Sequence, residues 1–483
     1  MFKFFKMRRI VSFIVLSFIL SHINAQSASI ICRAGFAFEI SNNPNWGNGE
    51  PVIINITPGS PAERAGLKLN DIILEVNGNG TYLKPHHTIK AWMLDNNEKD
   101  IEISIRNLET DFRTITIDKD CRSRDGIDES KLAPVFAFYS LEDVQNRNFH
   151  IPMKITTNPK SVFSDYRTFD FAPVEAGTPE IDVRISAIFE RKLKERGLIR
   201  DTDDPDFIIQ TFYSYQNNPA YNPNSQNKVE DIANWRFDLK SNKMVNLPLF
   251  SPTQVVQNED IPYFLEFGYR FYDRKYVEPG ELVQIWECDV KERVKTNYGL
   301  ENYLEINLPL ILLKYPYPGN MNLGTYEVNF LQYNYTGISY DIENLSRVAY
   351  VDPKSPAAQA GINRGDIIKS IQGIKLSNNL KSLTNSYRRF INETMDLRNP
   401  NTRYTDTNGY KDCMFWDVGE YNQVAKALDK KAYRSAFTYL FNFNQYIDWN
   451  TPPTISIEVE RNKENLNFEI KPEVYKSAHI SAF

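Results

Sequence analysis

The sequence predicts a multidomain α+β protein in which two related, small β-rich modules flank a central α+β domain. Three observations lead to this fold class. The chain has 483 residues, which is enough for roughly three domains of ordinary size. A segment of 21 residues recurs once, and the residues between the two copies alternate between strand-like and helix-like patterns.

The first 25 residues have the features of a secretion signal. Four basic side chains precede an apolar run from Ile10 to Leu20, and Ala25 supplies a small residue before Gln26. A membrane anchor needs a run of about 20 apolar residues, so this shorter run favours a cleaved signal peptide over residues 1–25. We therefore expect an exported protein, periplasmic or envelope-associated, with secretion as a further possibility.

Charge and histidine content limit the possible functions. The chain carries 56 basic and 61 acidic side chains, a net charge of −5, and removing the four basic residues of the signal changes this to −9. Such a balance gives no long-range attraction to phosphate backbones, which argues against a nucleic-acid partner. Only four of the 5 histidines remain in the mature chain, so there is little material for histidine-based catalysis.

The repeat is the most informative feature. Residues 58–78 and 353–373 are identical at 10 of 21 positions without a gap. In each copy a serine–proline pair, beginning at Ser60 or Ser355, starts a short helix, because serine caps the free N–H groups and proline fits the first turn. A glycine then ends the helix, and a β-branched strand follows. Each copy is therefore a strand, a one-turn helix and a strand.

A second matching element lies upstream of each copy, where a glycine precedes an alternating apolar strand at residues 33–40 and 335–342. At this point the sequence resembles PDZ domains, whose carboxylate-binding loop has the pattern glycine, apolar, glycine, apolar before the second strand. The resemblance implies a PDZ-like small β-barrel or sandwich over residues 27–121 and a second one over residues 331–475. The first loop glycine of the family pattern is replaced by arginine in one copy and by tyrosine in the other.

The resemblance implies peptide recognition by β-augmentation, in which an extended chain adds to the edge strand at residues 37–42 or 339–344. Its terminal carboxylate meets the backbone N–H groups of the loop. By the family pattern His87 opens the groove-lining helix and accepts a hydrogen bond from the ligand, although a solvated helix start explains it equally well. Arg33 either pairs with the carboxylate or is a surface charge. The implied peptide-binding residues are Arg33, Gly35, Phe36, Ala37, Phe38, His87 and Ala91 in the first copy, and Gly337, Ile338, Ser339 and Tyr340 in the second.

The two copies differ in their loops. The first has a turn-rich loop at residues 42–49, whose Trp46 either faces a ligand or covers its own core. The second has a helical insertion at about 394–452 before its closing strand at 454–459. An insertion of this size can cap or gate the groove, so the sequence leaves open whether the second groove is accessible.

The central residues 122–330 predict an α+β domain. They contain strands at 166–171 and 206–213, an amphipathic helix from Pro179 to Gly197, and a short final helix at 310–313. This order is similar to a domain of unknown function found in bacterial envelope lipoproteins. The resemblance supports an envelope setting but brings no activity and no functional residues.

Four cysteines are too few for a disulfide framework. The first and last strands of the first module are expected to be antiparallel neighbours, and Cys32 ends one strand while Cys121 follows the other. That register places the two cysteines at opposite ends, which argues against a bridge between them. The disulfide state of Cys32, Cys121, Cys288 and Cys413 stays open.

Catalytic and metal-binding motifs are missing from the sequence. It has no nucleophile loop of the high-temperature-requirement proteases, no HExxH zinc motif and no phosphate-binding loop. Residues 118–129 carry acids in a register resembling a calcium loop but lack its glycine, so we interpret them as a solvated linker. The sequence predicts no cofactor and no metal.

The predicted function is that of a non-enzymatic tandem PDZ scaffold that binds peptide C-termini or exposed strands in the bacterial cell envelope. The mature chain is expected to have no integral membrane span, and its oligomeric state is open. One alternative is an enzyme or protease accessory with an active site in the central domain. Another is a structural protein whose grooves are filled by its own insertions.

Overall fold

The computed structural model describes residues 30–482 apart from 58, 95–98, 124–125, 137–147, 174–178, 228, 279, 318–319, 377–388, 391, 405–412, 429, 431–432, 434 and 441–453. The predicted signal peptide lies outside the described residues. In the part of the chain that is described, no helix is long and apolar enough to cross a membrane.

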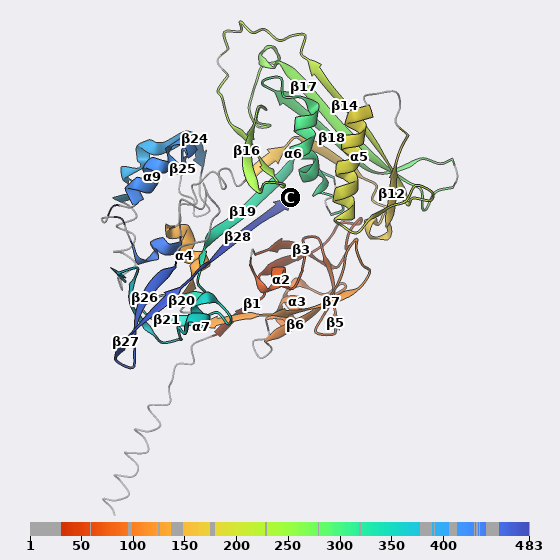
Figure 1. Ribbon diagram of the computed structural model, residues 1–483. Coiled ribbons are helices and arrows are strands. Elements are labelled where there is room, and N and C mark those ends of the chain that lie inside the picture. Colours follow the sequence, from red (N-terminus) through yellow and green to blue (C-terminus); the bar gives the residue numbers. More distant parts are fainter. Residues whose placement is uncertain are drawn as a thin grey trace, which may run out of the picture.

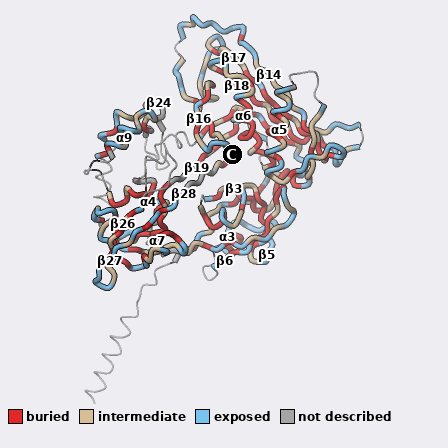
Figure 2. Tube along the Cα trace, in the orientation of Figure 1, coloured by how far each residue is buried: buried red, intermediate tan, exposed pale blue. Residues whose placement is uncertain are grey.

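The protein is mostly β and consists of three packed groups of elements (Figure 1). Buried residues follow the strands of each group, while the turns are exposed (Figure 2). Three clusters of buried apolar side chains form the cores. The expected multidomain organisation is confirmed, but strands outweigh helices more than the expected α+β class implies.

The first module is a strongly curved sheet with strand order β2-β3-β4-β6-β7, and β5 pairs with β4. Its apolar face, which includes Ile53, Ile73 and Ile103, is fully buried. The helices α2 and α3 cover the sheet. The bounds are β2 Phe36–Ile40, β3 Pro51–Ile56, α2 Pro61–Arg64, β4 Ile72–Val76, β5 Asn79–Gly80, α3 His86–Met93, β6 Asp100–Arg106 and β7 Arg113–Asp118.

The short helix of the second repeat copy starts with the same serine cap as that of the first. The hydroxyl of Ser60 accepts the N–H of Glu63 at 3.3 Å, and the hydroxyl of Ser355 accepts that of Ala358 at 3.2 Å. The serine–proline caps predicted from sequence are therefore confirmed. The bounds are β20 Ile338–Asp341, β21 Val348–Val351, α7 Pro356–Ala360, β22 Ile367–Ile371, β23 Ile374–Lys375, β26 Ile455–Arg461 and β27 Glu464–Ile470.

The insertion into the second copy is described in part. Among its described elements, Trp416, Val424 and Phe437 are buried against the core of the second copy. The insertion therefore packs onto this module. The bounds are η4 Met395–Leu397, β24 Arg398–Tyr404, β25 Cys413–Trp416, η5 Val418–Glu420, α9 Tyr421–Leu428 and η6 Ala436–Leu440.

The central group is a six-stranded mixed sheet with order β11-β18-β17-β14-β12-β13, against which α5 and α6 pack. A separate hairpin, β15-β16, packs beside it. The bounds are β11 Met153–Thr157, η2 Phe163–Asp165, β12 Thr168–Phe171, α5 Pro179–Lys194, β13 Ile199–Arg200, β14 Phe207–Asn217, β15 Asn234–Asp238, β16 Lys243–Leu247, η3 Asn258–Asp260, β17 Tyr263–Asp273, β18 Val283–Val294 and α6 Leu300–Leu312.

The final helix of this group is longer than the sequence suggested. We expected it to start after Pro309, but α6 begins at Leu300 and contains Pro309 in its interior. Proline removes one helical hydrogen bond. Tyr303 and Leu304 before the proline and Leu310 after it are buried in the core of the central group, and this burial stabilises the helix on both sides of the proline.

A long antiparallel ribbon joins the central group to the second module. It is formed by β19 (Gly324–Tyr335) and β28 (Glu473–Ala482), which pair from Tyr326↔Ala482 to Tyr335↔Glu473. The short β10 (Asn148–Ile151) pairs with the other side of β19. Figure 1 shows the ribbon crossing between the two groups. The expected end of the second module at residue 475 therefore falls inside a strand.

The turn-rich loop at residues 42–49 fastens the first module to the central group. Trp46 is buried there, and its ring N–H donates to the carbonyl of Asn70 at 2.8 Å. The Asn45 amide donates to the carbonyls of Asn158 and Ser161, both at 2.6 Å. Of the two roles predicted for Trp46, the structure therefore supports a core residue.

Residues after the first module pack with the second one. The short β9 (Gly126–Asp128) pairs with β20, and α4 (Glu129–Phe136) follows directly. Leu132 and Ala133 of α4 are buried in the core of the second copy. The expectation that residues 122–136 belong to the central domain, with residues 118–129 as a solvated linker, is therefore wrong.

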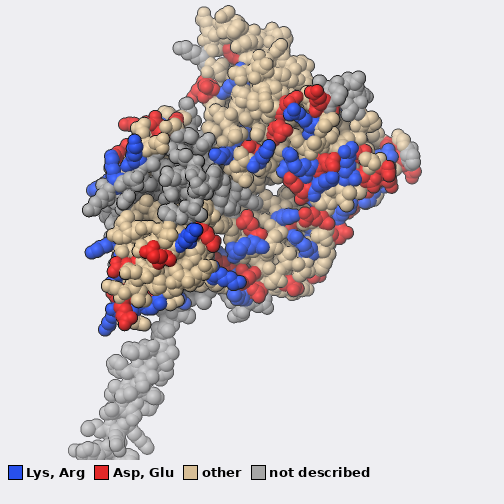
Figure 3. Space-filling view, in the orientation of Figure 1, with Lys and Arg blue, Asp and Glu red and all other residues tan. Residues whose placement is uncertain are grey.

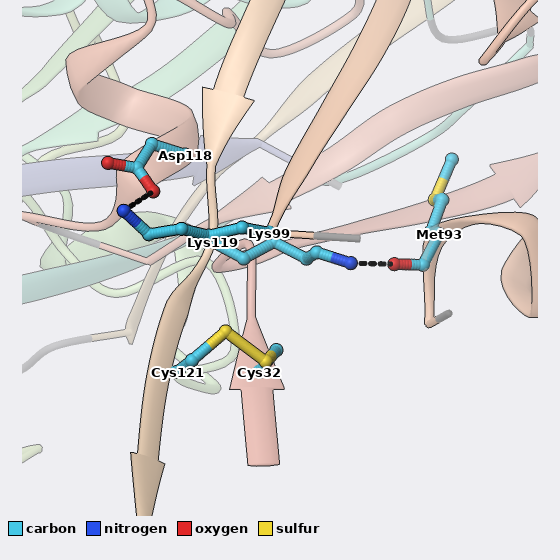
Figure 4. The surroundings of a disulfide bond; sticks show 6 residues. All are labelled: Cys32, Met93, Lys99, Asp118, Lys119 and Cys121. Atoms are coloured by element: carbon cyan, nitrogen blue, oxygen red, sulfur yellow. Dashed lines mark hydrogen bonds and ion pairs between the residues drawn. A yellow bond between two sulfur atoms is a disulfide. The ribbon is translucent and has the colours of Figure 1, made fainter. Parts of the chain in front are cut away.

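The structure contains a disulfide between Cys32 and Cys121, against our expectation (Figure 4). The expectation assumed that the first strand pairs with the closing strand β7. Instead, β1 (Ile30–Arg33) pairs with β8 (Asp120–Ser123), a separate strand that starts after Lys119. In this register Cys32 lies directly opposite Cys121.

The chain around this disulfide is fixed by side-chain contacts as well. The buried Lys119 donates to the carbonyl of Met93 at the end of α3, at 3.4 Å (Figure 4). The exposed Lys99 pairs with Asp118 at 3.4 Å. The disulfide closes a loop of 89 residues that contains the whole first module.

Removing this disulfide should destabilise the first module. In the chain-entropy model, a loop of this length contributes about 4.6 kcal/mol. A Cys32→Ser, Cys121→Ser protein should therefore unfold at lower urea concentration than the oxidised wild type. Reductant should lower the wild-type midpoint to that of the variant and leave the variant unchanged. A wild-type midpoint that does not respond to reductant would contradict the bridge.

Candidate functional site

In the first module the edge strand β2 lies beside the start of the helix α3, and we call the space between them the first groove. Within the described residues, β2 has a strand neighbour on one side only, β3. Phe38 of β2 points inward, and its ring stacks on that of His86 at a centroid distance of 4.5 Å. Ala37, on the opposite face of β2, is exposed. The first groove is therefore bordered by a strand edge without a described partner and by the stacked rings of Phe38 and His86.

The helix that lines the first groove begins one residue earlier than expected. We expected His87 to open it, but α3 starts at His86, and His86 is the residue that contacts Phe38. At 3.6 residues per turn, His87 and Ala91 lie about 100° and about 140° around the helix from His86. Both are exposed. His86 is exposed as well, and the ligand contact predicted for His87 stays a prediction.

The loop before β2 is shaped by Gly35. Its φ is +84°, and a Cβ atom at this position would lie 2.1 Å from the Cβ of Ser60. The carbonyls of Ala34 and Gly35 accept hydrogen bonds from Ala62 and Thr57, both outside the loop, at 2.9 and 2.8 Å. These contacts fix the loop, so its N–H groups keep their direction without a ligand. Arg33, just before the loop, is exposed.

The loop before β20 has the same geometry. Gly337 has φ +88°, and a Cβ there would lie 2.2 Å from the Cβ of Ser355. The carbonyls of Thr336 and Gly337 accept from Ala357 and Asp352 at 2.9 and 2.8 Å. Thr336 and Gly337 are therefore the counterparts of Ala34 and Gly35. We call the space beside this loop and β20 the second groove.

The edge of β20 is occupied by the chain itself. β9 adds to it antiparallel, with Ser339 opposite Asp128 and Tyr340 opposite Ile127. The expectation that an external strand adds to this edge is therefore wrong for the structure described here. Ile338, Ser339 and Tyr340 are all buried.

The carboxylate of Glu129 lies in the loop of the second groove. Its Oε2 accepts the backbone N–H groups of Thr336 at 2.8 Å and Gly337 at 3.0 Å. Its Oε1 accepts the hydroxyls of Thr336 and of Tyr439, the latter at 2.5 Å. Tyr439 belongs to the insertion, and its hydroxyl also contacts that of Tyr340 at 2.6 Å. Four donors from two elements therefore bind one carboxylate.

Glu129 is almost fully buried, with 2% of its surface exposed. Burial raises the pKa of Glu129 from its usual 4.5 to about 7, and the hydrogen bonds from Thr336 and Tyr439 offset part of that rise. A buried charge without partners is strongly destabilising, so the four donors are needed to keep an ionised carboxylate here.

In the first groove the corresponding N–H groups belong to Ala34 and Gly35. Among the described residues, neither N–H group donates a hydrogen bond. Their counterparts, Thr336 and Gly337, bind a carboxylate. The first groove therefore has the same donor pair without its acceptor.

The central group buries an ion pair away from solvent. Arg236 and Glu292 form an ion pair at 3.0 Å, with side-chain exposures of 0% and 1%. Asn307 accepts from Arg236 at 3.1 Å, and the hydroxyl of Tyr303 contacts Glu292 at 3.3 Å. These groups satisfy one another inside the core. In the described part of the chain, no three His, Cys, Asp or Glu side chains gather as a metal site requires.

The charged surface shows no region dominated by one sign on the face seen in Figure 3. Lysine and arginine are interspersed there with aspartate and glutamate. Such a surface gives no directed attraction to a highly charged partner.

Sequence reasoning missed two residues of the grooves. His86 was passed over because the helix start was placed one residue late. Glu129 was read as part of a solvated linker, since an acidic residue far from the repeat gives no local signal that it contacts residues 336–337.

Stability should depend on pH through Glu129. Between pH 4.5 and about 7 the folded protein holds a proton that the unfolded chain has lost, so the free energy of unfolding should fall as pH rises through this range. Glu129→Gln imitates the protonated form and should remove this part of the slope, up to about 3 kcal/mol at about 1.4 kcal/mol per pKa unit.

Urea unfolding of both proteins at pH 5 and pH 8 measures this difference. Burial also raises the pKa of Asp71, to about 6, but this contribution is present in both proteins and cancels in the comparison. Equal slopes for the wild type and Glu129→Gln would contradict the proposed titration.

Comparison with known proteins identifies the family. A family model described as PDZ domain matches residues 52–106. No curated protein matches the chain. The crystal structure of a PDZ domain protein from Parabacteroides distasonis is 35% identical, with a TM-score of 0.81, and the match covers 94% of this chain and 99% of that chain.

Two other solved structures are similar to parts of the chain. The HtrA3 PDZ domain bound to a phage-derived ligand is 20% identical over 19% of this chain and 88% of that chain, with a TM-score of 0.17. A DUF4136 family protein from Bacteroides thetaiotaomicron is 13% identical over 33% of this chain and 89% of that chain, with a TM-score of 0.18. The near full-length match decides the assignment: the chain belongs to the same family as the PDZ domain protein of Parabacteroides distasonis.

Proposed function

We propose that the protein is an exported, non-enzymatic scaffold whose first groove binds the C-termini or exposed strands of other proteins in the bacterial cell envelope. A PDZ domain is a peptide-binding module with a role in protein interaction.

One observation carries the proposal. The N–H groups of Ala34 and Gly35 have no acceptor within the described residues, whereas the equivalent pair in the second groove binds a carboxylate. Two converging N–H groups beside an unpaired strand edge fit an extended peptide that ends in a carboxylate. Main-chain pairing along β2 would supply affinity, and side chains facing α3 would supply selectivity.

The envelope setting rests on two features. Residues 1–25 have the pattern of a cleaved signal peptide. The Cys32–Cys121 disulfide is of a kind that persists in oxidising compartments such as the periplasm. Together they favour a mature protein that works outside the cytoplasm, where it holds partner proteins.

The central group offers less support for the alternative of an enzyme. Its buried ion pair, Arg236 with Glu292, is enclosed by its own hydrogen-bond partners. A catalytic acid or base must reach the substrate. The scaffold proposal therefore accounts for more of the structure.

Peptide binding should depend on a free C-terminus. We would screen the mature full-length chain by fluorescence polarisation against a library of labelled peptides, each made with a free and an amidated C-terminus. Amidation should weaken binding by at least about tenfold, because it removes hydrogen bonds to a charged acceptor. Equal affinity for both forms would rule out carboxylate recognition.

A charge reversal provides a matched test of the site. Arg33→Glu places a negative charge beside the loop of the first groove and should weaken binding about two- to fivefold, as expected for one exposed charge. Lys471→Glu makes the same change at an exposed position of the second module and should leave binding unchanged. Equal effects of the two substitutions would place the binding site elsewhere.

A further inference from the structure

We propose that the second groove is a carboxylate-binding peptide site whose ligand is internal: residues Gly126–Glu129 fill it, and the side chain of Glu129 takes the place of a terminal carboxylate. External peptides are thereby excluded from this groove. The proposal concerns the second groove alone, so it holds whether or not the first groove binds a partner.

The direction of β9 is the first argument. It runs antiparallel to β20, from Gly126 opposite Asp341 to Asp128 opposite Ser339. The next residue, Glu129, therefore arrives beside the loop that precedes β20. A bound peptide with the same direction would bring its terminal carboxylate to the same place. Here the chain continues into α4, and the side chain supplies the carboxylate.

The donor set is the second argument. Two backbone N–H groups converge on Oε2 of Glu129, and two hydroxyls converge on Oε1. The backbone pair belongs to Thr336 and Gly337, and the loop passes so close to Ser355 that a Cβ atom at position 337 would clash with it. Four donors that include two backbone N–H groups suit a carboxylate, which offers two acceptor oxygens.

The closure of the site is the third argument. Leu132 and Ala133, which follow Glu129 in α4, are buried in the core of the second copy. Tyr439 of the insertion covers Glu129 from the other side and contacts Tyr340. An external peptide would have to displace these buried contacts together with β9. The second groove therefore binds residues Gly126–Glu129 and fixes them against the second module.

Chemical rescue tests carboxylate recognition in the full-length mature chain. Glu129→Ala leaves the four donors without an acceptor and should lower the melting temperature by several degrees. Sodium propionate should restore part of this loss in a saturable way, compared with sodium chloride at equal ionic strength. Wild type and Glu129→Gln, whose sites stay filled, should show no saturable gain.

Two results of this experiment would overturn the proposal. One is a Glu129→Ala protein that melts at the wild-type temperature, since the bound carboxylate would then contribute nothing to the stability of the protein. The other is a destabilised Glu129→Ala protein whose melting temperature responds equally to propionate and chloride.

A second variant covers the case in which Glu129→Ala does not fold. Glu129→Asp keeps the charge but withdraws the carboxylate by one methylene group, while Glu129→Gln keeps the length. Hydrogen exchange at the N–H groups of Thr336 and Gly337 should be at least about tenfold faster in the aspartate variant than in wild type, and near wild type in the glutamine variant. Unchanged exchange in the aspartate variant would overturn the proposal.

Discussion

The buried carboxylate of Glu129 is the interaction on which the arrangement of the chain depends. It lies in the loop formed by Thr336 and Gly337, and it can be buried only because four donors meet it there. This bond fixes β9 against β20 and starts α4, whose apolar side chains complete the core of the second copy. A residue that follows the first module thus closes the second one.

Two further connections join the first module, the central group and the second module. The loop around Trp46 and Asn45 fastens the first module to the central group, and the ribbon of β19 and β28 joins that group to the second module. The disulfide fixes the start of the segment that leads to β9. With the second groove filled, the edge of β2 and the N–H groups of Ala34 and Gly35, which have no partner among the described residues, are the part of this arrangement suited to a ligand. In the proposed function, the first groove is the site that receives the partner.

Local patterns in the sequence predicted much of the fold. The caps at Ser60 and Ser355, the loop glycines Gly35 and Gly337 and the helix α5 were all predicted, because each depends on neighbouring residues. The errors came from distant contacts. Neither the pairing of Cys32 with Cys121 nor that of Glu129 with Thr336 has a signature in the residues next to it. The one-residue shift from His87 to His86 is of the size that helix boundaries usually carry.

The central claim is that one groove accepts an external carboxylate and the other does not. The most direct measurement follows the backbone amide signals of labelled, mature protein by NMR during titration with a peptide that has a free C-terminus. The account predicts that the amides of Ala34 and Gly35 shift on binding, while those of Thr336 and Gly337 stay unchanged. Shifts at Thr336 and Gly337, or none at Ala34 and Gly35, would contradict it.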